Sequence, residues 1–176
     1  MLRSLDLLDA LQGRVLESVA DVPPDVLSTR PNARTWCVAE VLDHLTRVET
    51  SLVRVMRSNL GQDHRTSLLG KVGYSAALLV MYSPIRIQLP KSLNFVAPGD
   101  FANDLETLRM QWLEARQQLK AFLAPLSDLQ WEKGLFRHPA AGWMSAHDCI
   151  TFSRAHLYHH TWQLARIRKH EQKRAG

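Results

Sequence analysis

Cysteine is scarce in this 176-residue sequence, which contains only Cys37 and Cys149 and no Cys-x-x-Cys pair. A disulfide framework is therefore excluded, and we expect both thiols to be small core residues rather than ligands or nucleophiles. So few cysteines fit a reducing cytoplasm. A chain of this length buries about 68–70% of its unfolded surface, so its hydrophobic core needs no covalent support.

Long apolar runs are also missing. The longest mostly apolar stretch, Val72 to Tyr82, falls well short of the roughly 20 residues that a membrane-spanning helix needs. Residues 1–21 carry Asp6 and Asp9 within an amphipathic pattern and lack the apolar core of a signal peptide. We therefore expect a cytoplasmic protein without a membrane partner.

Positive charge is in excess but is not arranged as in a nucleic-acid-binding surface. The formal net charge is +5, and much of the excess lies in residues 166–174. We expect residues 169–176 to form a basic, frayed tail rather than a patterned groove, so no nucleic-acid partner is expected. The hydrophobic fraction of 45% and the charged fraction of 22% are typical of a globular protein. The sequence thus predicts a single domain over residues 1–176.

Strand-type alternation is nearly absent, and apolar residues instead recur at spacings of three and four. This pattern predicts an all-α fold of four or five helices. Gly70 and Gly73 weaken the third helix, and residues 125–143 are expected to form a loop. The predicted helices cover residues 3–20, 36–59, 67–82, 100–122 and 145–168.

Polar residues predict where several of these helices begin. Thr35 and Asp100 are the expected N-caps of the second and fourth helices. Ser145 with Asp148 three residues later resembles a capping box at the start of the last helix. The segment 83–99 contains three prolines, and we expect an irregular, unusually long connection that could form one wall of a site.

The sharpest chemical signal is a pair of histidines one helical turn apart. His156 and His160 lie on the predicted helix 145–168, so their rings point the same way. Both rings can reach one ion at about 2.0–2.1 Å. They interrupt the apolar stripe of that helix, where a buried imidazole needs a partner to offset its lost hydration. His44, on the edge of the apolar stripe of helix 36–59, offers a third ligand, and together the three predict a divalent-metal site.

Other interpretations of the histidines compete with this one. The pair alone also fits a solvated helix face or a hydrogen-bonded core residue. His159 is a rival ligand, but it is rotated about 100° from His160, so we expect it at the rim of a pocket or facing solvent. Leu157 stands where a HExxH metalloprotease carries its general-base glutamate, which disfavours a peptidase. Four more histidines are expected on the surface or in loops: His64, His138, His147 and His170.

Nearby polar residues are candidates to orient the three imidazole rings by hydrogen bonds. Glu40, one turn before His44, is the first candidate. Gln163 and Asp148 are weaker candidates, and each could equally be a helix cap or a surface residue. Three aromatic residues could contribute to a pocket wall, although such residues are more often plain core: Tyr82, Trp143 and Tyr158.

Two segments of the sequence resemble those of a known family. The run Trp36-Cys-Val-Ala-Glu40-Val-Leu-Asp-His44-Leu45 resembles the W-x-x-x-E-x-x-x-H-L start of the second helix in DinB-like proteins. His138-Pro-Ala-Ala-Gly142-Trp-Met-Ser, followed by His156-x-x-His159-His160-x-x-Gln163, resembles their C-terminal signature. The match covers both ends of the chain in the same helical order, and the middle adds nothing to it.

The resemblance implies a four-helix bundle, with up to five or six helices when short ones are counted, that is often a homodimer. It implies a divalent metal, usually zinc, nickel or manganese, on histidines that map onto His44, His156 and His160. Relatives of known activity are transferases or isomerases that use bacillithiol, mycothiol or glutathione. We therefore expect a metal-dependent S-transferase or hydrolase with a small-molecule substrate and a low-molecular-weight thiol as cofactor. A non-catalytic metal-binding bundle for stress response or interaction is the alternative, and no catalytic residue is assigned.

Overall fold

A computed structural model describes residues 2–86, 88 and 91–175. In this part of the chain there are seven α-helices, one 3-10 helix and one short hairpin. The all-α prediction is confirmed, and the hairpin, residues 136–144, occupies most of the second half of the segment 125–143, where a loop was expected. The elements in order are α1 (Leu2–Ser18), α2 (Pro24–Leu27), α3 (Val38–Asn59), α4 (Leu68–Tyr82), η1 (Lys91–Val96), α5 (Leu105–Leu123), α6 (Asp128–Glu132), β1 (Phe136–His138), β2 (Gly142–Met144) and α7 (Ala146–Ala175).

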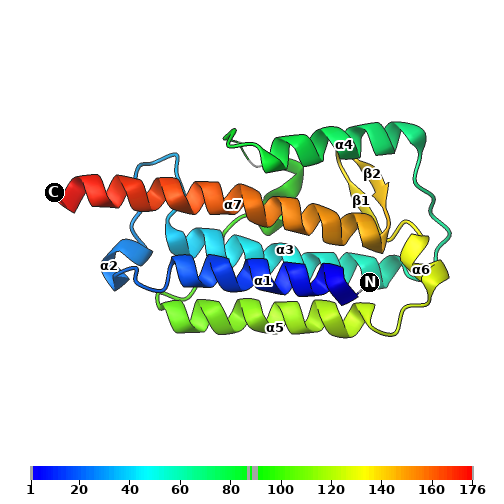
Figure 1. Cartoon of the computed structure of the whole chain (residues 1–176), viewed down its shortest axis with the longest axis horizontal. Helices are drawn as coiled ribbons and strands as arrows, with labels where there is room; N and C mark the ends of the chain where they lie inside the picture. Colours follow the sequence, from blue (N-terminus) through cyan, green and yellow to red (C-terminus); the bar gives the residue numbers. More distant parts are fainter. Residues whose placement is uncertain (1, 87, 89–90, 176) are drawn as a thin grey trace.

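Four helices, α1, α3, α5 and α7, lie side by side with their long axes roughly aligned (Figure 1). The closest packing is between α3 and α5 and between α1 and α7. Helices α3 and α5 run in the same direction, opposite to α1 and α7 (Figure 1). Parallel neighbours require a long crossover, which the segment containing α4 and η1 supplies. The predicted four-helix bundle is thus confirmed, with a connectivity that is not simply up-and-down.

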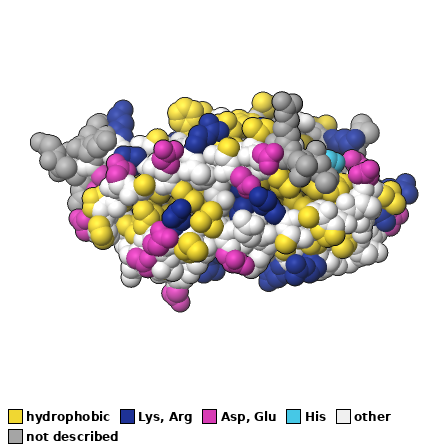
Figure 2. Space-filling model, turned by 60° about the horizontal axis from the view of Figure 1, so that its bottom comes forward, with side chains coloured by type: hydrophobic (Ala, Val, Ile, Leu, Met, Phe, Trp, Pro, Cys, Tyr) yellow, Lys and Arg dark blue, Asp and Glu magenta, His cyan; other side chains and the backbone are white. Residues whose placement is uncertain are grey.

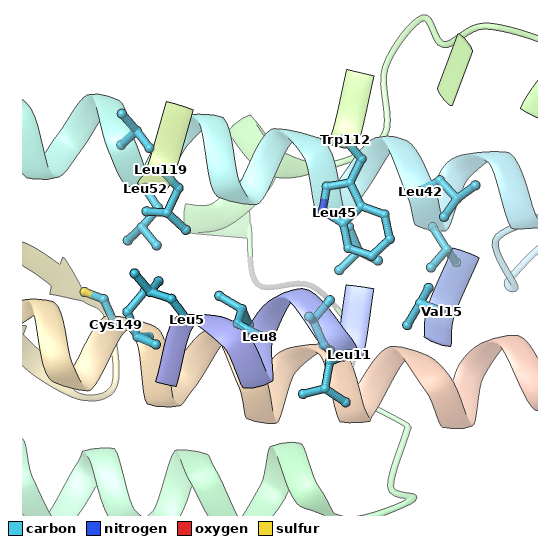
Figure 3. Packing of buried hydrophobic residues seen from close by; sticks show 14 of the residues in the cluster. Leu5, Leu8, Leu11, Val15, Leu42, Leu45, Leu52, Trp112, Leu119 and Cys149 are labelled. Carbon is cyan, nitrogen blue, oxygen red and sulfur yellow. The ribbon is translucent and has the colours of Figure 1, made fainter. Parts of the chain in front are cut away.

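The apolar stripes seen in the sequence meet at the centre of this bundle. Figure 3 shows side chains of α1 pointing toward those of α3 and α5. Cys149 joins this core and Cys37 is equally buried, as predicted for small core residues. Burial raises the pKa of Cys37 to about 11 and raises that of Cys149 as well, so neither thiol resembles a reactive thiolate. Core residues labelled in Figure 3 are Leu5, Leu8, Leu11, Val15, Leu42, Leu45, Leu52, Trp112, Leu119 and Cys149.

A buried polar cluster links three helices of the bundle. Arg116 of α5 is 2% exposed and binds Glu49 of α3, with its Nε 2.9 Å from Glu49 Oε2. Asp9 of α1 accepts a second bond from Arg116 Nη1 at 3.1 Å. Trp112 Nε1 donates to Glu49 Oε1 at 3.0 Å. A buried charge is stable only when it is paired and hydrogen-bonded. These contacts therefore hold α3 and α5 in a fixed relative position.

The N-cap of helix α3 is Cys37, two residues after Thr35, where the cap was predicted. The backbone N–H of Thr35 donates to the carbonyl of Asn32 at 3.1 Å, which holds Thr35 in a turn. Cys37 is the N-cap instead, because the Glu40 carboxylate accepts a bond from its backbone N–H at 2.9 Å. A side chain three residues into a helix can satisfy a free N–H group in this way, and it decides the start here.

The other two cap predictions have different outcomes. Helix α5 is capped by Asp104 rather than Asp100, since Asp104 Oδ1 accepts from the backbone N–H of Thr107 at 2.7 Å. At the start of α7 the capping pair is confirmed, with Ser145 N–H donating to Asp148 Oδ2 at 2.9 Å. Asp148 is therefore engaged at the helix start rather than in orienting a histidine ring.

Helix α4 lies outside the bundle and packs on α7 and β2. Its glycines allow this close approach. A Cβ atom at Gly73 would lie 2.1 Å from the carbonyl oxygen of Ala140 in the β1–β2 turn. The glycine that weakens the helical pattern is therefore required by packing.

Gly73→Ala is expected to destabilise the protein by about 1–3 kcal/mol, because a backbone carbonyl occupies the space of the new methyl group. Gly13→Ala in α1 is the matched control, since nothing lies within 4 Å of a Cβ there. It should stabilise by up to about 1 kcal/mol through helix propensity alone. Urea unfolding of both variants measures the difference, and a stabilising Gly73→Ala change would contradict the packing argument.

Two surface features complete the fold. Helix α7 continues through Ala175 and extends beyond the bundle (Figure 1), where the sequence pattern predicted a frayed tail from residue 169. On the face in Figure 2, side chains of both charges are interspersed with hydrophobic ones. Among the described helices, none has the length and apolarity to span a membrane.

Candidate metal centre

The structure brings His44 of α3 together with His156 and His160 of α7. The Nε2 atom of His156 lies 3.2 Å from that of His44 and 3.0 Å from that of His160. One ligand atom from each residue lies within 4.8 Å of the others. Imidazoles from opposite ends of the chain thus converge on one point.

The two separations from His156 suit nitrogens bound to one divalent ion. Bonds of about 2.0–2.1 Å to a common ion place two nitrogens roughly 2.9 Å apart in octahedral and roughly 3.3 Å apart in tetrahedral geometry. The observed 3.0 and 3.2 Å fall between the two values. The cluster therefore fits a metal with little movement of the side chains.

Hydrogen bonds on the far side of two rings determine where their protons lie. His44 Nδ1 is 2.6 Å from the carbonyl oxygen of Val96, and His160 Nδ1 is 2.7 Å from Gln163 Oε1. A carbonyl only accepts, so each Nδ1 carries the hydrogen and each Nε2 of the neutral ring keeps a lone pair. The lone pairs of His44 and His160 therefore both lie near His156 Nε2, an arrangement that a cation satisfies.

The environment keeps all three rings neutral. Burial lowers the pKa of His44 to about 4. The pKa values of His156 and His160 lie well below 6.5, first because the rings are desolvated and then because of the neighbouring histidines. Neutral imidazole is the form that binds metal, so the cluster is ready to do so at pH 7.

The histidine cluster opens onto a cavity of about 920 Å³. Cavities of this size hold drug-sized ligands. Its wall comes from α3, α4, the 83–99 segment, the hairpin and α7, and it is largely apolar. The 83–99 segment thus forms one wall, as predicted. Apolar lining residues include Trp36, Val48, Leu52, Val80, Phe95 and Phe152.

Comparison with known proteins now identifies the family. The family model of the DinB superfamily matches residues 7–164. The chain belongs to the DinB superfamily. No curated protein sequence matches it. A solved structure that it resembles is YfiT from Bacillus subtilis, described as a probable metal-dependent hydrolase with an unusual four-helix bundle topology; the TM-score is 0.63 at 17% identity, covering 95% of this chain and 85% of that chain.

The family resemblance drawn from two sequence segments is therefore confirmed for most of the chain. At 17% identity the likeness to YfiT shows a shared fold and nothing more. The activity of this DinB-superfamily chain depends on its own site residues.

Glu40, the first candidate to orient His44, does not take that position. Its carboxylate binds the guanidinium of Arg30 and the backbone N–H of Cys37. Because Glu40 lies in the first turn of α3, its carboxylate satisfies a free N–H there. The carbonyl of Val96 faces His44 instead. A backbone carbonyl has no signature in the sequence, whereas the contact of Gln163 with His160 follows from their i, i+3 spacing.

His159 is buried rather than facing solvent, with 7% of its surface exposed. It lines the cavity, and its ring centroid is 5.4 Å from that of His160. The connection after α4 covers it, and its ring interacts with the backbone of Ser83. Among the described residues, no group bonds to its buried Nδ1 atom. This DinB-superfamily chain therefore holds a fourth imidazole beside the cluster.

Predictions for two other histidines and for three aromatic residues differ from the structure. His138 and His170, expected on the surface or in loops, line the cavity. The three aromatic candidates lie outside its wall. Trp143 stacks on His64 at 3.6 Å between ring centroids, and the rings of Tyr82 and Tyr158 contact each other at 5.5 Å.

Lowering the pH from 7 to 5 is expected to destabilise the metal-free protein. The folded-state pKa values of His44, His156 and His160 lie below the ordinary 6.5. The unfolded chain therefore binds more protons than the folded chain between about pH 6.5 and 4. The neutral histidines contribute fully to the stability of the folded state above pH 6.5, and this contribution is lost as the pH falls. Urea unfolding in EDTA across this range measures the slope. His44→Gln should flatten it, and no pH dependence in the parent protein would contradict the assignment.

Proposed function

We propose that this chain is a divalent-metal-dependent enzyme that transfers a small-molecule thiol to an electrophilic substrate. The observation that carries the proposal is the convergence of neutral imidazole nitrogens at the wall of a large apolar cavity. Structural metal sites are closed by four protein ligands, whereas catalytic sites keep a position open. Three ligands beside a cavity support a catalytic site.

The residues around the site have distinct tasks in this proposal. His44, His156 and His160 hold the ion, and we favour zinc, with nickel or manganese as alternatives. The bound ion would supply a lowered pKa to a thiol or water that coordinates it. The Val96 carbonyl and Gln163 orient two of the rings, and the apolar wall excludes water from the reacting groups.

The charges of the cavity favour thiol transfer over hydrolysis. Among its described lining residues there is no Asp or Glu, so no carboxylate is available as the general base for an attacking water. A thiol whose pKa is lowered would need no carboxylate base, because the thiolate is itself the nucleophile. The composition of the cavity wall therefore supports the transferase hypothesis.

Hydrolysis of a small molecule is the second candidate, because of His159. Its Nδ1 has no bond within the described residues, and the ring lines the cavity. A neutral imidazole nitrogen in this position can accept a proton from an attacking water. The description of YfiT as a probable metal-dependent hydrolase is consistent with this alternative.

The purified chain, loaded in turn with zinc, nickel and manganese, should conjugate thiol to monochlorobimane. Bacillithiol, mycothiol and glutathione are the thiols to supply, and p-nitrophenyl esters without thiol test hydrolysis. Turnover should require the ion and disappear in His156→Ala. Ester cleavage without thiol transfer would favour the second candidate. Metal binding with neither activity would overturn both and favour a non-catalytic metal-binding bundle.

A further inference from the structure

The cavity wall carries cations but no carboxylate. Three arginines line it, Arg34, Arg86 and Arg166, and its described lining residues include no Asp or Glu. The segment 83–99, which supplies Arg86, has no acidic residue anywhere in its sequence. Nothing in that segment can neutralise the arginines, and a divalent ion on the histidines would add to the positive charge.

Arg86 lies close enough to Arg166 to disfavour the charge of Arg166. Burial, and then repulsion from Arg86, lowers the pKa of Arg166. Within the described residues neither is part of an ion pair, and Arg166 Nη1 donates only to the carbonyl of Pro84 at 3.3 Å. Arg116, by contrast, has the carboxylate of Glu49. Arg86 is exposed and Arg166 is partly buried, so both guanidinium groups have donors available to an anion that enters the cavity.

The arginines are set apart from the histidines along the cavity. Arg166 follows His160 by six residues on α7, which corresponds to about 9 Å along the helix axis. Gln163, between them in the sequence, lines the same cavity. Arg86 lies two residues after Pro84, whose carbonyl accepts a hydrogen bond from Arg166 of α7. The cavity wall therefore carries the three histidines at one place and a guanidinium group farther along α7.

We propose that this cavity takes an elongated, largely apolar small molecule with an oxyanion at one end, held by Arg86 and Arg166. A carboxylate, sulfonate or phosphate matches the donors of the two guanidinium groups. The opposite end of the molecule reaches the histidine cluster. This last point rests on the proposed function, while the oxyanion site stands on the arginines alone.

Two fluorescent probes that differ by one group test the proposal in metal-free protein. 8-Anilinonaphthalene-1-sulfonate is apolar and anionic, and N-phenyl-1-naphthylamine has the same rings without the sulfonate. We expect the sulfonate to bind at least about tenfold more tightly, since a charge-assisted bond contributes that much or more. In Arg86→Gln/Arg166→Gln its affinity should fall by about tenfold or more, while that of the neutral probe changes less than about twofold.

Two controls make this result specific. Arg54→Gln removes an exposed arginine of α3 that does not line the cavity, and it should leave both affinities unchanged. The neutral probe reports that each variant keeps an intact cavity. Both probes can also adhere to exposed apolar side chains of α4 such as Leu79, which is 75% exposed, but the arginine substitutions leave that contribution unaltered.

Equal affinity for the two probes, or sulfonate binding that survives the double substitution, would overturn the oxyanion site. Because the titration needs no metal, its failure is separate from failure of the proposed function. A chain that binds metal and turns over thiol but does not prefer the sulfonate retains the proposed function alone. A chain that prefers the sulfonate but binds no metal retains only the oxyanion site.

Discussion

His160→Ala is expected to weaken binding of a divalent ion by at least about 100-fold, because it removes one of three converging nitrogens. Changes to residues that merely orient a ligand already cost about 10–100-fold. The His160 Nε2 atom lies 3.0 Å from that of His156, so its loss opens the site on one side. Competition with a chromophoric chelator, combined with metal analysis of the purified protein, measures the affinity and the stoichiometry.

His147→Ala is the matched control for this experiment. His147 lies on the same helix, its side chain is 51% exposed, and it is 3.4 Å from Glu132 rather than near the cluster. Its replacement should leave metal affinity unchanged. A saturating ion should also stabilise the parent protein, by about 4 kcal/mol at 1,000 times the dissociation constant. Equal affinity in the two variants would show that the cluster does not hold the ion.

Glu49→Ala is expected to destabilise the fold by about 3–5 kcal/mol, because it leaves the guanidinium of Arg116 buried without its main partner. Arg116 is 2% exposed, and in the variant it keeps the carboxylate of Asp9 as an ion-pair partner. The loss of stability should therefore lie toward the lower end of this range. Urea unfolding measures it. The double variant Glu49→Ala/Arg116→Met should recover most of the loss, since an apolar side chain replaces the stranded charge.

Glu106→Ala supplies the comparison on the surface. Glu106 pairs with Arg109 at 3.3 Å on α5, and both side chains are more than half exposed. Exposed pairs of this kind contribute roughly 0–1 kcal/mol, so the change should be small. A Glu49→Ala variant no less stable than Glu106→Ala would show that the buried cluster does not hold α3 on α5.

The buried ion pair also bears on the candidate metal centre. Glu49 follows His44 by five residues on α3, about 140° around the helix. One side of α3 is therefore fixed against α5 by Glu49, while another presents His44 to α7. Because the helix is rigid, the contact with α5 helps to set the position of the His44 ring.

Local patterns in the sequence determined the helical elements and part of the site. Spacings of three and four placed the main helices, since amphipathic periodicity is a local property, but α5 begins five residues later and α7 ends seven residues later than predicted. The i, i+4 spacing of His156 and His160 alone put their rings on one face of α7, and the spacing of Gln163 put it beside His160. Family-like segments at both ends of the chain indicated the bundle.

Only the tertiary structure decided how distant segments meet. The convergence of His44 with α7 was expected from the sequence, but the Val96 carbonyl behind its ring and the burial of His159 depend on the path of the chain between α4 and α5. The position of Arg86 at the cavity wall follows from the same path. Such contacts join groups far apart in the sequence, and a backbone carbonyl is common to every residue. No local pattern of side chains can therefore specify them before the chain has folded.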